Sequence, residues 1–158
     1  MNKNSKCTED IKIYTKSILI PVIIGSLVGL IISNSIDYNM LEKPPLSPPS
    51  ILFPIVWTIL YTLMGISYGI LKQKKLVDSE IKYIYYLQLF VNATWSIIFF
   101  TLKLRLFSFI WILLLDMLVI IMIKCFYEKN KTAGLLQIPY LLWTLFATYL
   151  NFTIYVLN

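Results

Sequence analysis

The chain has 158 residues, of which 58% are hydrophobic and only 14% are charged. This composition excludes an ordinary soluble domain, in which about 25% of the residues are charged. The formal net charge of +6 does not indicate a nucleic-acid partner, because the basic residues lie between apolar runs rather than along one face.

Five apolar runs divide the chain, and each is close to the ~20 residues that a helix needs to cross the hydrocarbon of a bilayer. They cover residues 17–33, 51–71, 83–101, 106–126 and 135–157. None alternates between apolar and polar residues as the strands of a membrane barrel do. We therefore expect an all-α membrane protein with five transmembrane helices in a single bundle. A basic tail, residues 1–16, precedes the membrane domain, residues 17–158.

The Lys and Arg residues are distributed unevenly over the segments that connect these runs. Eleven belong to the tail and to the second and fourth connections, and three belong to the opposite side. Because basic connections stay in the cytoplasm, we expect a cytoplasmic amino terminus and an external carboxyl terminus. A bacterial plasma membrane is the expected location.

The first connection, residues 34–50, contains four prolines within six positions: Pro44, Pro45, Pro48 and Pro49. Proline fixes its own φ and pushes the preceding residue towards extended geometry, so this segment cannot be helical. Two interpretations remain open, a rigid connector and a lid over one mouth of the bundle.

Aromatic and small polar residues recur at helical spacing in the second, third and fifth runs, so each group shares one helix face. The candidates for a binding pocket are Trp57, Tyr61, Asn92, Trp95, Phe99, Trp143, Ala147 and Asn151. Aromatic side chains that merely fill the bundle or line the membrane interfaces are the alternative. Asn92 has the strongest claim, because an amide inside a membrane helix needs a partner.

Asp116 is the only acid within any of the five runs, and exposure to lipid would cost several kcal/mol. We expect it to face inward, either as a structural acceptor of hydrogen bonds or as a group that handles protons. The pairs Gly25/Gly29 and Gly65/Gly69 permit close helix approach, within the chain or between two copies.

The sequence lacks the residues that several kinds of chemistry require. The chain contains no histidine, which excludes histidine-ligated haem, and its two cysteines have no metal-ligand spacing. No phosphate-binding glycine loop or nucleophile elbow is present. We expect no metal site and no required cofactor.

Three groups of residues together resemble one known family. The first is Leu41, Lys43, Pro44, Pro48 and Pro49, followed by Trp57, Tyr61, Met64 and Gly65; the second is Gln88, Leu89, Asn92, Trp95 and Ser96; the third runs from Ile138 and Pro139 through Trp143, Phe146 and Ala147 to Asn151. This pattern is similar to that of the translocator protein family (TspO, tryptophan-rich sensory protein).

The resemblance implies a receptor or sensor that binds a metal-free porphyrin such as protoporphyrin IX, with Tyr38 added to the ligand-binding candidates. It also implies sterol as a possible ligand and a homodimer in the bilayer. A light-dependent porphyrin-degrading enzyme that uses Trp57 and Trp143 is one alternative. A passive transporter of porphyrin or lipid is another, although broken helices at the midplane, which many carriers have, are not evident in the sequence.

Overall fold

A computed structural model describes residues 3–36, 40–42 and 44–158, and this part of the chain contains helices and no strands. The α-helices are α1 (Lys3–Ile32), α2 (Leu52–Gln73), α3 (Ser79–Ser96), α4 (Arg105–Lys129), α5 (Lys131–Leu135) and α6 (Ile138–Leu157). A 3-10 turn, Ser33–Ser35, follows α1, and a π-helical turn, Ile97–Thr101, follows α3. The all-α expectation is confirmed.

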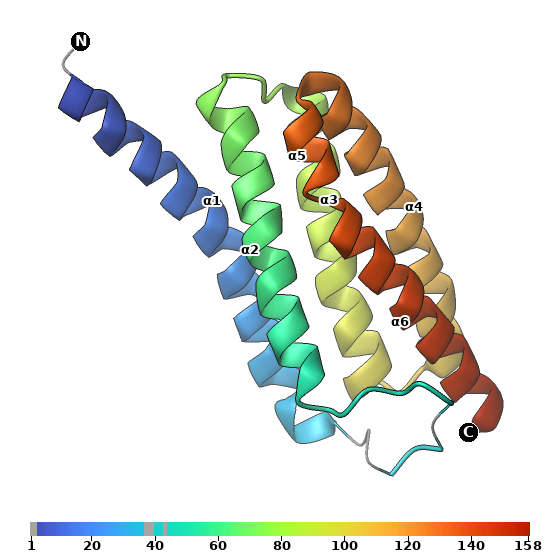
Figure 1. Cartoon of the computed structure of the whole chain (residues 1–158). Helices are drawn as coiled ribbons and strands as arrows, with labels where there is room; N and C mark the ends of the chain where they lie inside the picture. Colours follow the sequence, from blue (N-terminus) through green and yellow to red (C-terminus); the bar gives the residue numbers. More distant parts are fainter. Residues whose placement is uncertain (1–2, 37–39, 43) are drawn as a thin grey trace.

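Five of these helical segments are long and apolar enough to cross a membrane: Lys6–Ser35, Leu52–Gln73, Ser79–Thr101, Arg105–Lys129 and Lys131–Leu157. They pack side by side as one bundle, with the amino and carboxyl termini at opposite ends (Figure 1). Their outer surface is apolar, since Leu30 (71% exposed), Leu142 (63%) and Phe90 (61%) all face outward. Such a surface is stable only when lipid chains cover it.

Two helix boundaries differ from the runs read in the sequence. Residue 16, the expected end of the tail, falls inside α1, because the lysine-containing segment before it holds no residue that would break a helix. The last run is divided between α5 and α6, and Pro139 occupies the first turn of α6. Proline lacks the N–H that would continue the helix from α5, but it is well tolerated where a helix begins.

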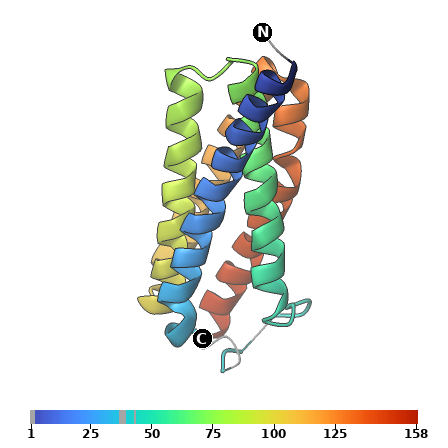
Figure 2. The same ribbon diagram turned by 90° about the vertical axis from the view of Figure 1, so that its left-hand side faces the viewer.

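The core lies among α2, α3, α4 and α6, and α1 packs on its outside. Fully buried side chains include Met64, Tyr85, Leu115 and Phe126, whereas in α1 only Ser17 and Pro21 are buried among the described side chains. Figure 2 shows α1 crossing obliquely in front of α2 and α3. Most of the surface of α1 therefore faces away from the core.

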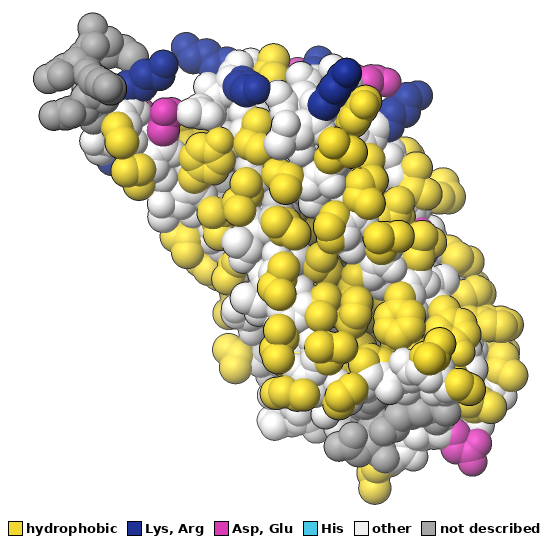
Figure 3. Space-filling view, in the orientation of Figure 1, with side chains coloured by type: hydrophobic (Ala, Val, Ile, Leu, Met, Phe, Trp, Pro, Cys, Tyr) yellow, Lys and Arg dark blue, Asp and Glu magenta, His cyan; other side chains and the backbone are white. Residues whose placement is uncertain are grey.

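The two ends of the bundle differ in charge. The end that contains the carboxyl termini of α2 and α4 carries the lysines of both interhelical connections, and blue Lys and Arg side chains gather there in Figure 3; we call it the basic end. The opposite end holds the first connection, the α3–α4 turn and the carboxyl terminus; we call it the loop end.

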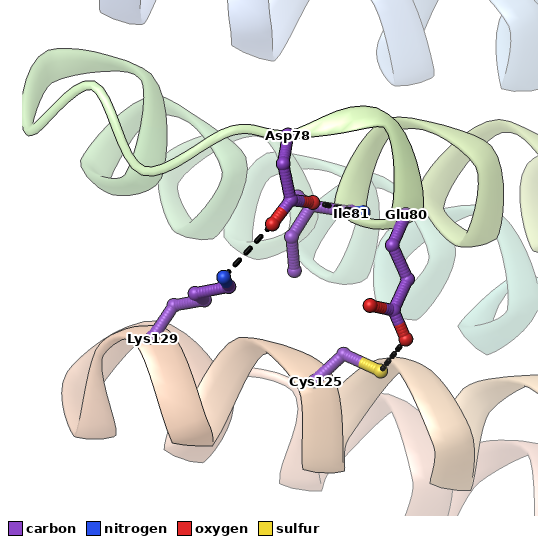
Figure 4. A network of polar contacts seen from close by, with 5 residues as sticks. All are labelled: Asp78, Glu80, Ile81, Cys125 and Lys129. Atoms are coloured by element: carbon purple, nitrogen blue, oxygen red, sulfur yellow. Dashed lines mark hydrogen bonds and ion pairs between the residues drawn. The ribbon is translucent and has the colours of Figure 1, made fainter.

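Polar contacts between α3 and α4 fasten the basic end (Figure 4). Asp78 caps α3 by accepting a hydrogen bond from the Ile81 N–H at 2.9 Å, and its other carboxylate oxygen lies 2.8 Å from Lys129 Nζ. The Ile81 N–H and the Lys129 ammonium hold the pKa of the Asp78 carboxyl below its usual value. Cys125 Sγ donates to a carboxylate oxygen of Glu80 at 3.7 Å.

Candidate functional site

A cavity of about 320 Å³ lies between α1, α2 and the end of α3, in the half of the bundle nearer the loop end. Its aromatic lining comes from Phe53, Trp57 and Tyr61 of α2, Trp95 of α3 and Phe100 of the π-helical turn. Its other wall is α1, which contributes Val22, Gly25, Ser26, Val28, Gly29 and Ile32. None of the described lining residues is charged.

Trp57 is the central ring of the aromatic wall. Its ring centroid lies 5.4 Å from that of Tyr61, one helical turn away, with an interplanar angle of 29°. It also lies 6.4 Å from the ring of Trp95 and 6.2 Å from the ring of Tyr140. Because Trp57 is only half-buried, one side of its ring remains available to a flat ligand.

Behind this wall, four buried polar side chains form a hydrogen-bonded chain, which we call the polar chain. The Tyr61 hydroxyl donates to Asn92 Oδ1 at 3.0 Å, and Asn92 Nδ2 donates to the Tyr140 hydroxyl at 2.7 Å. The Tyr140 hydroxyl then donates to Gln88 Oε1 at 3.0 Å. The polar chain joins α2, α3 and α6, and it supplies Asn92 with partners inside the protein.

Phe99 supports the aromatic wall without lining the cavity. It lies in the π-helical turn, 5.9 Å from the ring of Trp95 and almost parallel to it. The Arg105 guanidinium is 4.5 Å from the centroid of the Phe99 ring, and Arg105 Nη1 donates to the Phe99 carbonyl at 2.7 Å. Arg105 therefore fixes the turn through both the ring and the backbone.

The candidates on α6 lie outside the cavity lining. Trp143 meets Phe53 edge-on at 6.0 Å, and Phe53 lines the cavity whereas Trp143 does not. Ala147 is buried, and Asn151 accepts a hydrogen bond from the Ser108 hydroxyl at 3.2 Å, which ties α6 to α4. Tyr38 falls outside the described residues.

Asp116 faces inward, as expected, with only 5% of its surface exposed. One carboxylate oxygen accepts a hydrogen bond from the Thr148 hydroxyl at 2.7 Å, and this bond connects α4 to α6. Asp116 does not line the cavity. Its bond to Thr148 is structural, whereas its other carboxylate oxygen, Oδ1, is buried without a hydrogen-bond partner among the described residues, so both interpretations of Asp116 stay open.

The proline-rich connection is folded back against α6. The Tyr149 hydroxyl donates to the Pro45 carbonyl at 3.3 Å. The Asn158 side chain accepts from the Glu42 N–H and donates to the Glu42 carbonyl, both at 3.1 Å. Pro44 is buried, while Pro45 and Pro49 are exposed and Pro48 is half-buried. The described residues 44–50 thus run from the α6 side of the loop end back to α2 (Figure 1).

The contribution of α1 is the part of the site that sequence reasoning missed. Its aliphatic residues carry no signature of a pocket, and only Gly25 and Gly29 indicated a close helix contact. A Cβ atom on Gly25 would collide with the Tyr61 ring, so this glycine sets how near α1 stands to the aromatic wall. No group of three or more His, Cys, Asp or Glu that could hold a metal occurs among the described residues.

The cavity can therefore hold a flat, largely apolar molecule by stacking and by a few hydroxyl hydrogen bonds. Its described lining offers indole and phenol rings together with the hydroxyls of Ser26, Ser50, Thr58 and Ser96. Such a lining is typical of small-molecule sites. It contains no ionisable acid or base for proton transfer apart from the Tyr61 phenol, which is already engaged with Asn92.

Comparison with known proteins agrees with this architecture. The chain is 41% identical over 145 residues to tryptophan-rich protein TspO of Archaeoglobus fulgidus, covering 90% of this chain and 94% of the relative. It is 33% identical over 134 residues to protein CrtK of Rhodobacter capsulatus, covering 82% and 83% of the two chains. It is 31% identical over 119 residues to translocator protein of Ovis aries, covering 73% and 70%.

The sequence profile of the TspO/MBR family matches residues 17–157, which include all of the cavity-lining residues described above. Together with the five membrane-spanning helices, this match identifies the chain as an integral membrane protein that belongs to the TspO/MBR family.

Proposed function

We propose that this protein is a membrane receptor that binds protoporphyrin IX, or another flat hydrophobic molecule, in the cavity between α1 and the aromatic wall. The observation that carries the proposal is the half-buried Trp57 ring, placed among Tyr61, Trp95 and Tyr140 in a cavity without charged lining. Two relatives are consistent with receptor and transport roles, since one is named tryptophan-rich sensory protein and another translocator protein.

The size of the cavity sets a condition on the ligand. About 320 Å³ is near the lower limit of the ~300–1,000 Å³ that small-molecule sites occupy. A complete tetrapyrrole with its side groups is larger, so its binding requires the walls to move. Phe53 is the side chain whose displacement would bring the cavity nearer to Trp143, because Phe53 lines the cavity and packs edge-on against Trp143.

Light-dependent degradation of the bound porphyrin is the second candidate function, and the position of Trp57 favours it. An indole in contact with a photoexcited ring is a suitable one-electron donor, and dissolved dioxygen would be the oxidant that the degradation consumes. Trp143 could take part only after Phe53 moves, so the enzymatic proposal depends on the same displacement.

The deciding experiment mixes the purified protein with protoporphyrin IX in detergent, first in the dark and then under light. Saturable quenching of tryptophan fluorescence in the dark is the expected result, and its absence would refute the receptor proposal. Bleaching of porphyrin absorbance under light would add the enzymatic function. If the Trp57→Phe/Trp143→Phe double variant bleaches porphyrin at the wild-type rate, the tryptophans are not the electron donors.

The orientation and assembly of the protein belong to the same proposal. We place the basic end in the cytoplasm of a bacterial cell, as the positive-inside rule requires. A homodimer is proposed from the family resemblance. The glycine pairs give it little support, because a Cβ on Gly25, Gly65 or Gly69 would collide with atoms of the same chain.

A further inference from the structure

Helices α1 and α2 are in close contact along most of their interface, which we call the seam, because a glycine lies at each contact point. A Cβ on Gly69 would lie 2.8 Å from the Tyr14 ring, and a Cβ on Gly65 would lie 2.7 Å from the Ser17 carbonyl oxygen. A Cβ on Gly25, the next contact towards the loop end, would collide with the Tyr61 ring. Nothing larger than a hydrogen atom fits at these three positions.

The seam opens one helical turn further on. A Cβ on Gly29 would meet no atom within 4 Å, and Gly29 belongs to the cavity lining. Six residues that line the cavity are also exposed. Ser26 and Gly29 of α1 and Pro54 and Thr58 of α2 lie at this level, and Ile36 and Ser50 lie at the loop end. Residues that belong to both surfaces mark the place where a cavity opens to the outside.

The surroundings of this opening are apolar. On α1 it is flanked by Leu27 (55% exposed) and Leu30 (71%), and on α2 by Ile55 (51%) and Ile59 (54%). All of these positions lie within the membrane-spanning segments. The Thr58 hydroxyl on the rim donates to the Pro54 carbonyl at 2.8 Å, so it presents no unsatisfied donor to hydrocarbon.

The loop end is the alternative route, because Ile36 and Ser50 of the cavity lining are exposed there. The proline-rich connection is held to α6 by the two hydrogen bonds between Glu42 and Asn158 and by the bond from Tyr149 to Pro45. These contacts lie on the α6 side of the loop end, and no described residue of 40–49 lines the cavity. A ligand dissolved in the bilayer would meet an opening formed by residues of the cavity lining itself.

We propose that ligands reach the cavity sideways from the bilayer, through an opening between α1 and α2 whose rim is Ser26, Gly29, Pro54 and Thr58. The inference rests on the proposed function, since it presumes a hydrophobic ligand. An entrance of this kind would admit molecules that partition into hydrocarbon and are flat enough to pass between two helices. Gly29 becomes a specificity-determining residue, because any side chain at this position narrows the passage.

The first test measures rates of binding with protoporphyrin IX supplied in the lipid of reconstituted vesicles. Gly29→Leu should lower both the association and the dissociation rate by about tenfold, as expected when access rather than contact is changed. The fold should persist, because the space beside Gly29 is open. Leu142→Phe, at a lipid-facing position of α6 away from the opening, is the matched control and should bind at wild-type rates.

Two outcomes would overturn the proposal. Wild-type rates in Gly29→Leu, together with faster binding in Asn158→Ala, would place the entrance at the loop end. A lower affinity of Gly29→Leu with an unchanged association rate would mean that the leucine fills the cavity and does not obstruct its mouth.

A second test needs no porphyrin. A nitroxide label at Gly29→Cys, in a chain that also carries Cys7→Ser and Cys125→Ser, should collide often with oxygen and rarely with a water-soluble nickel complex. A label at Leu46, which is 82% exposed in the proline-rich connection, is the aqueous control. Equal nickel accessibility at the two sites would refute an opening to lipid. Failure of the wild-type protein to bind protoporphyrin IX would instead refute the proposed function.

Discussion

Tyr140 lies at the middle of the polar chain, where its hydroxyl accepts a hydrogen bond from Asn92 and donates one to Gln88. All three side chains are at most 1% exposed, so water cannot replace a lost partner. Tyr140→Phe should therefore lower the free energy of unfolding by about 1–3 kcal/mol, the cost of leaving buried polar groups unpaired. Thermal unfolding in detergent measures this loss. Tyr155→Phe, at a 40% exposed position of the same helix, is the control and should unfold like the wild type.

A substitution at Ala147 tests whether the ligand lies beside α6 or in the cavity on the other side of the bundle. The sequence pattern placed it beside the ligand, whereas the cavity of the structure is lined by α1, α2 and the end of α3. Ala147→Leu adds volume to a buried position and should cost about 1–3 kcal/mol of stability. Porphyrin affinity, measured by fluorescence quenching on folded protein, should remain that of the wild type. A large loss of affinity would show that the ligand occupies the α6 side of the bundle.

At the scale of the element, the end of α2 has an unusual residue in a left-handed conformation. Lys75 has φ = 56°, and its N–H donates to the Lys72 carbonyl while the Leu76 N–H donates to the Leu71 carbonyl. This is a Schellman motif, in which the left-handed position favours glycine. Lys75→Gly should therefore stabilise the protein by about 0.5–1 kcal/mol.

The neighbouring lysine provides the control for this prediction. Lys74 has φ = −83°, so Lys74→Gly removes the same charge without relieving any strain. It should leave stability unchanged or lower it by up to about 1 kcal/mol. Chemical denaturation of both variants measures the difference, and equal stabilities would show that backbone strain at Lys75 is negligible.

At the scale of the whole molecule, the class of fold could be predicted from the sequence, but only part of the site could. Apolar runs of the right length predict membrane helices, because the bilayer fixes how many residues must be apolar. Helical periodicity also predicts that Trp57 and Tyr61 share a face. It does not determine which helix packs against that face, and α1 carries only aliphatic residues, two glycines and Ser26 there. The fact that Phe53 lines the cavity, and that its neighbour Trp143 does not, depends on side-chain packing between helices, which no local pattern encodes.

The charge difference between the two ends predicts the orientation of the whole molecule. Lys72 in the last turn of α2 and Lys74 and Lys75 directly after it lie at the basic end, so transfer of this end across the membrane would be opposed. A fusion of alkaline phosphatase, which is active only outside the cytoplasm, should be active after Asn158 and inactive after Lys75. A green fluorescent protein, which matures in the cytoplasm, should give the opposite pattern at the same two positions. Active phosphatase after Lys75 would contradict the proposed orientation, and equal activity at both positions would indicate that the chain inserts in both directions.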